Sequence, residues 1–223
     1  MISHSIRILA CLCFLLSTNA KASVVEIDTN LGTLEITLHP EAAPNHVENF
    51  LNYVNDGDYN NSFFHRSVPG FIIQAGGFVY SNQQFTSVPI DPAVNNEFNL
   101  TNVRGTVAMA KLGDNPDSAT NQWFINLTDN STNLDNQNGG FTVFGTVSNG
   151  MSVADDIANL VRINAGGTFS DLPIRNFADV NDPIIWDDHL VMINGVSISE
   201  VPLPAGIYLF LSGLVSLQLL RKK

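Results

Sequence analysis

Cysteine is nearly absent from this chain: its 223 residues include two, Cys11 and Cys13, and both lie close to the amino terminus. Because both fall within the leader predicted below, the mature protein has no disulfide and no cysteine-based metal site. His65 has no second histidine, cysteine or acidic residue at metal-ligand spacing, so we interpret it as structural. The sequence therefore predicts neither a metal nor a cofactor.

Positive charge is also scarce, with 10 lysines and arginines against 21 aspartates and glutamates and a net charge of −11 at pH 7. All 21 acidic residues lie between residues 23 and 200. The basic residues in that range are Arg66, Arg104, Lys111, Arg162 and Arg175. A surface this acidic repels phosphate, which argues against nucleic acid as a partner. Arg66 is more informative because it is one of so few cations.

The amino terminus predicts an export signal over residues 1–22. Arg7 supplies a positive charge, Ile8–Leu16 an apolar core, and Ala20–Ala22 a small-x-small cleavage site. The apolar run is too short to span a bilayer, which favours cleavage over an uncleaved anchor. We expect an exported protein, periplasmic or at the cell surface. Length and 44% hydrophobic content predict a single globular domain at 23–200.

The carboxyl terminus, residues 201–223, carries a second predicted signal. Val201-Pro-Leu-Pro-Ala205 precedes a mostly apolar stretch, Gly206–Leu220, and a basic end. This order resembles the VPLPA variety of the PEP-CTERM sorting signals of Gram-negative bacteria. The resemblance implies transient association with the inner membrane until an exosortase-type protease removes the tail. A plain tail anchor is the alternative, although the stretch is slightly shorter than the about 20 residues that a spanning helix needs.

Short apolar runs dominate the chain between these two ends. Alternating residues predict an opening β-hairpin of Val24–Asp28 and Thr33–Leu38. Helical spacing after Pro44 predicts a helix that ends at Gly57 in a left-handed conformation, and a second helix is expected near Met151–Leu160. Further strands are predicted at Phe71–Gln74, Gly105–Ala110, Gln122–Leu127, Thr142–Val147 and His189–Ile193. Many strands with few helices are typical of an all-β protein whose sheet closes on itself.

The most specific pattern is the run Phe64–Phe78, Phe-His-Arg-Ser-Val-Pro-Gly-Phe-Ile-Ile-Gln-Ala-Gly-Gly-Phe. It places one cation, Arg66, among apolar residues, followed by the Gln74 amide and a glycine pair. This run closely resembles the signature of the cyclophilins, the peptidyl-prolyl cis–trans isomerases. Matching stretches lie at 95–98, 104–111, 117–126 and 141–145, so that the resemblance covers Val24–Leu160 and the final strand around Leu190–Ile193. It is closest to the bacterial periplasmic branch.

The resemblance implies a closed eight-stranded antiparallel β-barrel with a helix packed over each open end. It also implies isomerase activity on proline-containing polypeptides, with Arg66, Gln74 and Phe71 on the catalytic face. The reaction needs a donor aimed at the prolyl nitrogen, because amide resonance gives rotation a barrier of ~18–20 kcal/mol. Arg66 is suited to this role since a guanidinium keeps its charge, and Gln74 would orient it.

The resemblance further implies a substrate-binding set of Ile72, Ala110, Lys111, Gln122, Phe124, Leu134 and Phe141. Ile72, Phe124 and Leu134 would join Phe71 in an apolar socket for the proline ring, although residues of this kind also serve as simple core. The backbone at Lys111 and the amide of Gln122 would hold the peptide on either side of the bond. Three positions depart from the best-studied members: Ile72 replaces methionine, Asn133 an aromatic residue, and Phe141 a histidine or tyrosine.

Two classes of function stay open on the residues alone. One is an isomerase that assists folding of exported proteins, and the other is a proline-peptide binding module of a surface or matrix with little turnover. Arg66 together with Gln74 and Phe124 favours the isomerase, because a pure binder has no need of all three. We expect a monomer.

Overall fold

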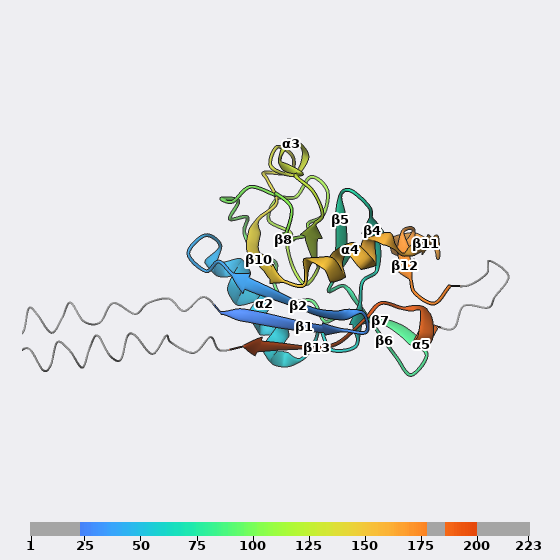
Figure 1. Ribbon diagram of the computed structural model, residues 1–223. Coiled ribbons are helices and arrows are strands. Elements are labelled where there is room, and N and C mark those ends of the chain that lie inside the picture. The colour runs from blue at the N-terminus through green and yellow to red at the C-terminus, as the bar shows by residue number, and fades with distance from the viewer. Residues whose placement is uncertain (1–22, 178–185, 200–223) are drawn as a thin grey trace, which may run out of the picture.

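The computed structural model describes residues 23–177 and 186–199, and its ribbon in Figure 1 contains more strands than helices. The strands are β1 Val24–Thr29, β2 Gly32–Leu38, β3 Ser62–Phe63, β4 Arg66–Val68, β5 Ile72–Ala75, β6 Phe78–Ser81, β7 Gln84–Ser87, β8 Thr106–Met109, β9 Trp123–Asn126, β10 Val143–Asn149, β11 Val161–Ile163, β12 Leu172–Ile174 and β13 Met192–Ser199. Eleven of them form one antiparallel sheet in the order β4-β5-β9-β8-β10-β2-β1-β13-β3-β6-β7. The predicted all-β class is confirmed.

The helices are α2 Pro44–Asp56, α3 Ser131–Leu134, α4 Met151–Asn159 and α5 Trp186–His189, with a 3-10 turn, η2, at Gly167–Phe169. The two longest match the two predicted helices and lie on different parts of the sheet. Helix α2 contacts β10 and β13, whereas α4 contacts β2, β4 and β5 (Figure 1). The closed eight-stranded barrel stays a prediction, because strand pairing in the described part of the chain runs linearly from β4 to β7.

The predicted opening hairpin is confirmed. Across β1 and β2, Val25 lies opposite Ile36 and Ile27 lies opposite Leu34, and all four side chains are fully buried. The Thr29 hydroxyl accepts the Leu31 N–H and donates to the Gly32 carbonyl, which closes the turn. Because side chains alternate across a strand, the buried set faces the core and the acidic residues between them face water.

Helix α2 begins and ends where the sequence predicts. Pro44 stands in its first turn, and Gly57 ends it at φ 75°, in the left-handed region that glycine adopts without steric cost. Glu97, from a distant loop, accepts the backbone N–H groups of Asn45 and His46. This carboxylate satisfies donors that the local sequence leaves unpaired, because Ala43 at the N-cap makes no side-chain hydrogen bond.

Aromatic rings occupy the centre of the main core. Phe50 of α2 contacts Tyr59, Trp123 and Phe144, with ring centroids 5.5, 6.2 and 4.9 Å away. These rings are all fully or almost fully buried. Burial of such side chains is the main favourable contribution to folding, so the core joins α2 firmly to β9 and β10.

A second apolar cluster forms around the segment that follows α4. Phe169 of η2 packs against Phe63, Phe78 and Phe85, with centroids 4.9–5.8 Å apart. The carbonyl of Asp171 accepts the backbone N–H of Ser67 in β4. Residues 161–177 therefore pack against β6 and the Phe85 ring of β7, and they support the strand that carries Arg66.

The predicted strand at His189–Ile193 is wrong at its start. His189 ends helix α5, and the strand β13 begins at Met192 and continues to Ser199. Its length follows from pairing with β1, which extends from Val24↔Ser199 to Thr29↔Ile193. Pairing with a distant strand, rather than local apolar residues, determines where β13 ends.

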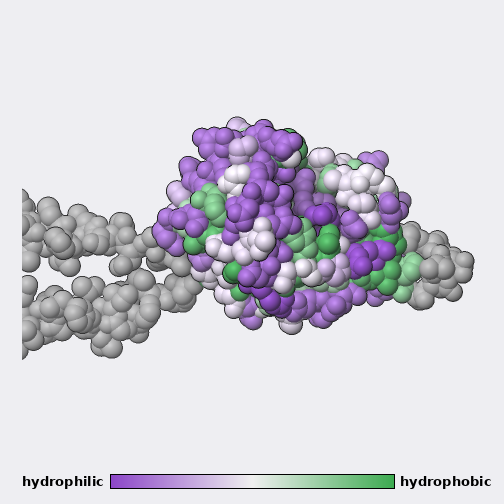
Figure 2. Space-filling view, turned by 90° about the horizontal axis from the view of Figure 1, so that it is seen from above, coloured by the Kyte–Doolittle hydropathy of each residue, from purple (hydrophilic) through white to green (hydrophobic). Residues whose placement is uncertain are grey.

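The predicted leader, 1–22, and tail, 201–223, lie outside the described residues. Within 23–177 and 186–199, no helix is long and apolar enough to cross a membrane. Hydrophilic residues cover most of the face seen in Figure 2, where hydrophobic residues form small separate patches. This surface agrees with the acidic composition of the domain.

Candidate functional site

Three neighbouring strands place the signature residues in one row. Arg66 of β4 lies opposite Gln74 of β5, and Gln74 lies opposite Phe124 of β9. The row continues from Phe124 to Ala108 of β8. Because directly opposite residues share one face of a sheet, a cation, an amide and an aromatic ring project together from this face.

A chain of hydrogen bonds holds the polar end of the row. Arg66 Nη1 donates to Gln74 Oε1 at 3.3 Å, and Gln74 Nε2 donates to Gln122 Oε1 at 2.8 Å. Both Arg66 and Gln74 are half-buried, so the guanidinium is restrained on one side and open to the groove on the other. The structure thus brings Arg66 and Gln74 together in the arrangement that the resemblance implies.

The glycine pair of the signature makes room for this chain. Gly76 has φ 84°, and a Cβ there would lie 2.4 Å from the carbonyl oxygen of Asn121. A Cβ on Gly77 would lie within 2.9 Å of side-chain atoms of Gln122. Residues larger than glycine would therefore push this segment away from β9 and displace the Gln122 amide.

An apolar cavity of about 220 Å³ adjoins the guanidinium. Ile72, Phe124 and Leu134 form its buried wall, and the half-buried rings of Phe71 and Phe141 border it. The rings of Phe124 and Phe141 meet edge to face, with centroids 5.8 Å apart. The full lining is Arg66, Phe71, Ile72, Gln74, Ala110, Lys111, Phe124, Leu134, Gln137 and Phe141. We call this cavity the socket.

Gln122 is the one predicted site residue outside the socket lining. It lines an adjoining cavity of about 300 Å³, which shares Gln74, Ala110 and Lys111 with the socket. The shared residues place the two cavities side by side, with Ile90 and Leu112 largely exposed along the second one. A peptide that places one residue in the socket has room beside it for a neighbouring residue.

Gln137 is a socket residue that sequence reasoning missed. Its amide donates to Asn133 Oδ1. Asn133, the position where the family often has an aromatic residue, is exposed and does not line the socket. The two residues lie one helical turn apart, on and after α3. Spacing four residues apart is the only signal in the sequence that could have linked them.

Buried asparagines support the socket from behind, and sequence reasoning missed them as well. Asn130 Nδ2 donates to the Phe71 carbonyl at 2.9 Å and to Asn126 Oδ1 at 2.7 Å. Asn102 Nδ2 donates to the Phe141 carbonyl at 2.9 Å, and Asn126 Nδ2 reaches Asn102 Oδ1 at 3.1 Å. These amides hold the backbone on both sides of the socket, since buried polar groups must be paired.

His65 lies beside Arg66 and is almost fully buried, with its ring edge-on to Phe78 at 5.0 Å. Burial, together with the positive charge of Arg66, lowers the pKa of His65 to about 4. The amide of Gln122 opposes this shift but lies outside hydrogen-bonding geometry with either ring nitrogen. The neutral ring adds no second positive charge directly beside Arg66.

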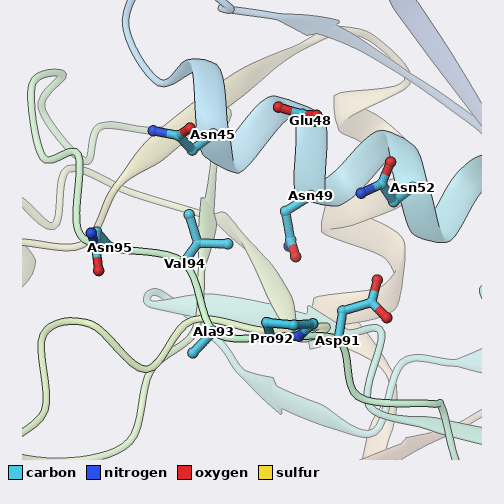
Figure 3. Close-up of a pocket in the computed structure, with 9 residues that line it drawn as sticks. All are labelled: Asn45, Glu48, Asn49, Asn52, Asp91, Pro92, Ala93, Val94 and Asn95. Carbon is cyan, nitrogen blue, oxygen red and sulfur yellow. The ribbon is translucent and has the colours of Figure 1, made fainter.

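A separate polar cavity of about 400 Å³ lies between α2 and residues 91–95. Figure 3 shows Asn49 projecting from α2 toward Pro92 and Asp91, and Asn45, Glu48 and Asn52 of the same helix also line this cavity. It shares no residue with the socket, and the amides and carboxylates of its lining stand beside Pro92, Ala93 and Val94. Among the described residues, no group of three or more histidine, cysteine, aspartate or glutamate side chains is arranged to hold a metal ion.

An antiparallel sheet that presents one cation beside an apolar socket defines a protein suited to holding a peptide at proline. Residues 24–178, more than half of the chain, match the family described as cyclophilin type peptidyl-prolyl cis-trans isomerase. The chain therefore belongs to the cyclophilin family and is a peptidyl-prolyl cis–trans isomerase. The match extends beyond Leu160, where the sequence-based resemblance ended.

Named relatives agree with this assignment. The peptidyl-prolyl cis-trans isomerase of Acinetobacter baylyi is 46% identical over 149 residues, which cover 66% of this chain and 78% of that protein. Isomerase A of Dickeya dadantii is 43% identical over 146 residues, covering 64% and 74%. Isomerase B of Escherichia coli is 41% identical over 155 residues, covering 67% and 92%.

The fold is also similar to that of a solved structure. A cyclophilin-type isomerase from Cryptosporidium parvum, crystallised in the presence of the dipeptide Ala-Pro, has a TM-score of 0.58 and 22% sequence identity. The similarity covers 80% of this chain and 99% of that one. It shows a shared cyclophilin fold.

Proposed function

We propose that this isomerase assists the folding of exported proteins by Arg66-assisted rotation of the X-Pro amide. The supporting observation is the half-buried guanidinium, bonded to Gln74 and bordering an apolar socket of about 220 Å³. Phe71, Phe124 and Leu134 would hold the proline ring there. The cation would then face the prolyl nitrogen rather than water.

The chemistry requires no covalent step. Rotation about the X-Pro bond passes through a state in which the nitrogen lone pair has left amide resonance and can accept a hydrogen bond. Arg66 would donate to that nitrogen, and the apolar wall would strengthen the interaction because it excludes water. Such stabilisation is selective for the twisted amide, so it would raise the rate rather than the affinity alone.

Proline-containing polypeptides are the proposed substrates, and the Ala-Pro dipeptide present with the Cryptosporidium parvum relative is in keeping with them. The groove continues past Lys111 into the cavity lined by Gln122, which would accommodate a flanking residue. Export to the periplasm or cell surface is proposed from the leader at 1–22. Transient association with the inner membrane is proposed from the tail at 201–223, and we infer a monomer.

Cis–trans exchange of a proline tetrapeptide by the full-length protein tests the role of Arg66. We expect Arg66→Ala to lower kcat/KM by about tenfold or more, a loss of about 1.4 kcal/mol or more in transition-state stabilisation. Arg66→Lys keeps the charge without the planar fork and should recover only part of the rate.

Unchanged turnover in a folded Arg66→Ala protein would remove Arg66 from the mechanism. A wild-type protein that binds the peptide without accelerating exchange would instead fit the binding module of a surface or matrix. Circular dichroism of each variant provides the control for folding.

A further inference from the structure

The side chain of Lys111 turns away from solvent and toward a neighbouring turn. Its ammonium donates to the carbonyl oxygens of Asn138 at 2.8 Å and Gly140 at 2.7 Å, and to Asn96 Oδ1 at 3.2 Å. It also lies 4.8 Å from the centroid of the Phe141 ring. Burial lowers the pKa of Lys111. All three donors of the ammonium therefore have acceptors within the protein.

The turn that receives this ammonium is conformationally demanding. Asn138, Gly139 and Gly140 follow one another with φ of 50°, 74° and 77°. Glycine adopts such φ values without steric cost, and Asn96 Nδ2 donates to the Gly139 carbonyl at 2.6 Å. Asn138 Nδ2 returns a hydrogen bond to the Leu112 carbonyl at 2.9 Å. Lys111 and Leu112 are thus both bonded to this turn: the Lys111 ammonium donates to its carbonyls, and the Leu112 carbonyl accepts from Asn138.

Phe141 follows this turn directly, and its ring borders the socket. Its backbone is held by Leu134 and Asn102, whereas its ring contacts Phe124 and the Lys111 ammonium. The cation–π contact and the fixed turn together limit where the ring can lie. Without the ammonium, the carbonyls of Asn138 and Gly140 would lose this donor and the Phe141 ring its cation–π contact.

We propose that Lys111 is a positioning residue that holds the 138–140 turn and thereby places the Phe141 ring in the socket. The inference rests on the proposed function for the identity of the substrate. It assigns a role to the ammonium of Lys111, apart from the backbone role that the family resemblance implies. Phe141 would contact the proline ring in the ground state and the transition state alike. Loss of the Lys111 ammonium should therefore raise KM and leave kcat nearly unchanged.

The test compares Lys111→Met with Lys111→Arg and with Arg162→Met in the full-length protein. Methionine keeps an unbranched side chain but removes the positive charge and all hydrogen-bond donors. Arginine keeps the positive charge and offers N–H donors. Arg162 lies exposed on β11 and away from the socket, so Arg162→Met controls for the loss of one positive charge.

We expect Lys111→Met to raise KM for a proline tetrapeptide about fivefold or more with kcat within about twofold of wild type. Lys111→Arg and Arg162→Met should keep KM near the wild-type value. NMR signals of the Phe141 ring, assigned by comparison with Phe141→Leu, should shift in Lys111→Met and stay in place in Arg162→Met.

A folded Lys111→Met protein with unchanged KM and unchanged Phe141 signals would overturn the inference. So would a fall in stability without either change, since that would make the contact merely structural. An inactive wild-type protein would refute the proposed function, and the NMR comparison would still decide whether Lys111 places the Phe141 ring.

Discussion

At the scale of single residues, the fold treats two adjacent side chains in opposite ways. Arg66 is half-buried with its guanidinium bonded to Gln74, and His65 is buried with its pKa lowered to about 4. A protonated imidazole would repel the guanidinium and would have to lose its hydration. The charge next to Arg66 therefore does not change with pH across the neutral range, because His65 stays neutral there.

The lowered pKa of His65 predicts a defined loss of stability in acid. Above pH 6.5 the histidine is neutral in both states and adds no pH dependence. Between pH 6.5 and about 4 the unfolded chain binds a proton that the folded protein does not, so stability falls as pH falls. We expect His65 to contribute a loss of about 2–3 kcal/mol between pH 7 and pH 4.5.

Urea unfolding of wild type and His65→Phe at both pH values measures this contribution. Phenylalanine keeps an aromatic contact with Phe78 and cannot take up the proton. Carboxylates titrate in both proteins, so the difference between the two pH dependences isolates His65. Equal pH dependences would contradict the prediction and place the titration elsewhere.

At the scale of elements, the socket is lined partly by residues of paired strands and partly by residues outside those strands. The strands β4, β5 and β9 supply Arg66, Gln74 and Phe124 through backbone pairing alone. Leu134 and Phe141 lie outside these strands, and the Phe141 N–H donates to the Leu134 carbonyl. Leu134 ends helix α3 and Phe141 lies in a loop, so no strand ladder places them, and the buried Asn102 amide holds the Phe141 carbonyl.

Removal of the central amide should cost stability at this junction. Asn126 is fully buried, accepts from Asn130, and donates to Asn102 and to the Thr106 hydroxyl. We expect Asn126→Ala to lower the free energy of unfolding by about 2–4 kcal/mol, because it leaves buried partners unpaired and creates a small cavity.

Chemical denaturation checks this value, with Asn136→Ala as the matched control. Asn136 is exposed and bonds only to carbonyls at the start of α3, so its replacement should change stability by less than about 0.5 kcal/mol. Similar stability changes in the two variants would show that the buried asparagines do not act as a support.

At the scale of the whole molecule, the two ends of the domain lie together. Val24 pairs with Ser199 where β1 and β13 run side by side, as Figure 1 shows. The predicted leader and tail are therefore attached at neighbouring points of one sheet. Both signals could act without interrupting the strands β4, β5 and β9 that carry the proposed catalytic residues.

Intact mass measurement in the native host tests the proposed tail signal. If Val201–Ala205 is a protease address, the mature protein should lack Gly206–Lys223 and should be absent from the inner-membrane fraction. The physical reason is that the apolar run is shorter than the about 20 residues a stable spanning helix needs. A membrane-bound protein that still ends at Lys223 would make the tail a permanent anchor.

The sequence by itself determined the features that depend on neighbouring residues. Alternation defines the first hairpin, and Pro44 and Gly57 bound α2, because strand faces and helix ends follow from local backbone geometry. The signature run likewise identifies Arg66 and Gln74, since the two meet across adjacent strands that a short turn connects. Strands of two to four residues, such as β3 and β7, are too short for alternation to reveal.

Only the tertiary structure decided which distant polar groups meet. Asn130 reaches the carbonyl of Phe71, 59 residues away, and the Lys111 ammonium reaches that of Gly140, 29 residues away. Residues 161–177 pack against β6 and the Phe85 ring of β7 through aromatic contacts that no local pattern signals. Asparagine and lysine are typical of exposed loops, and only the packing of separate segments shows that these amides and this ammonium are enclosed and paired.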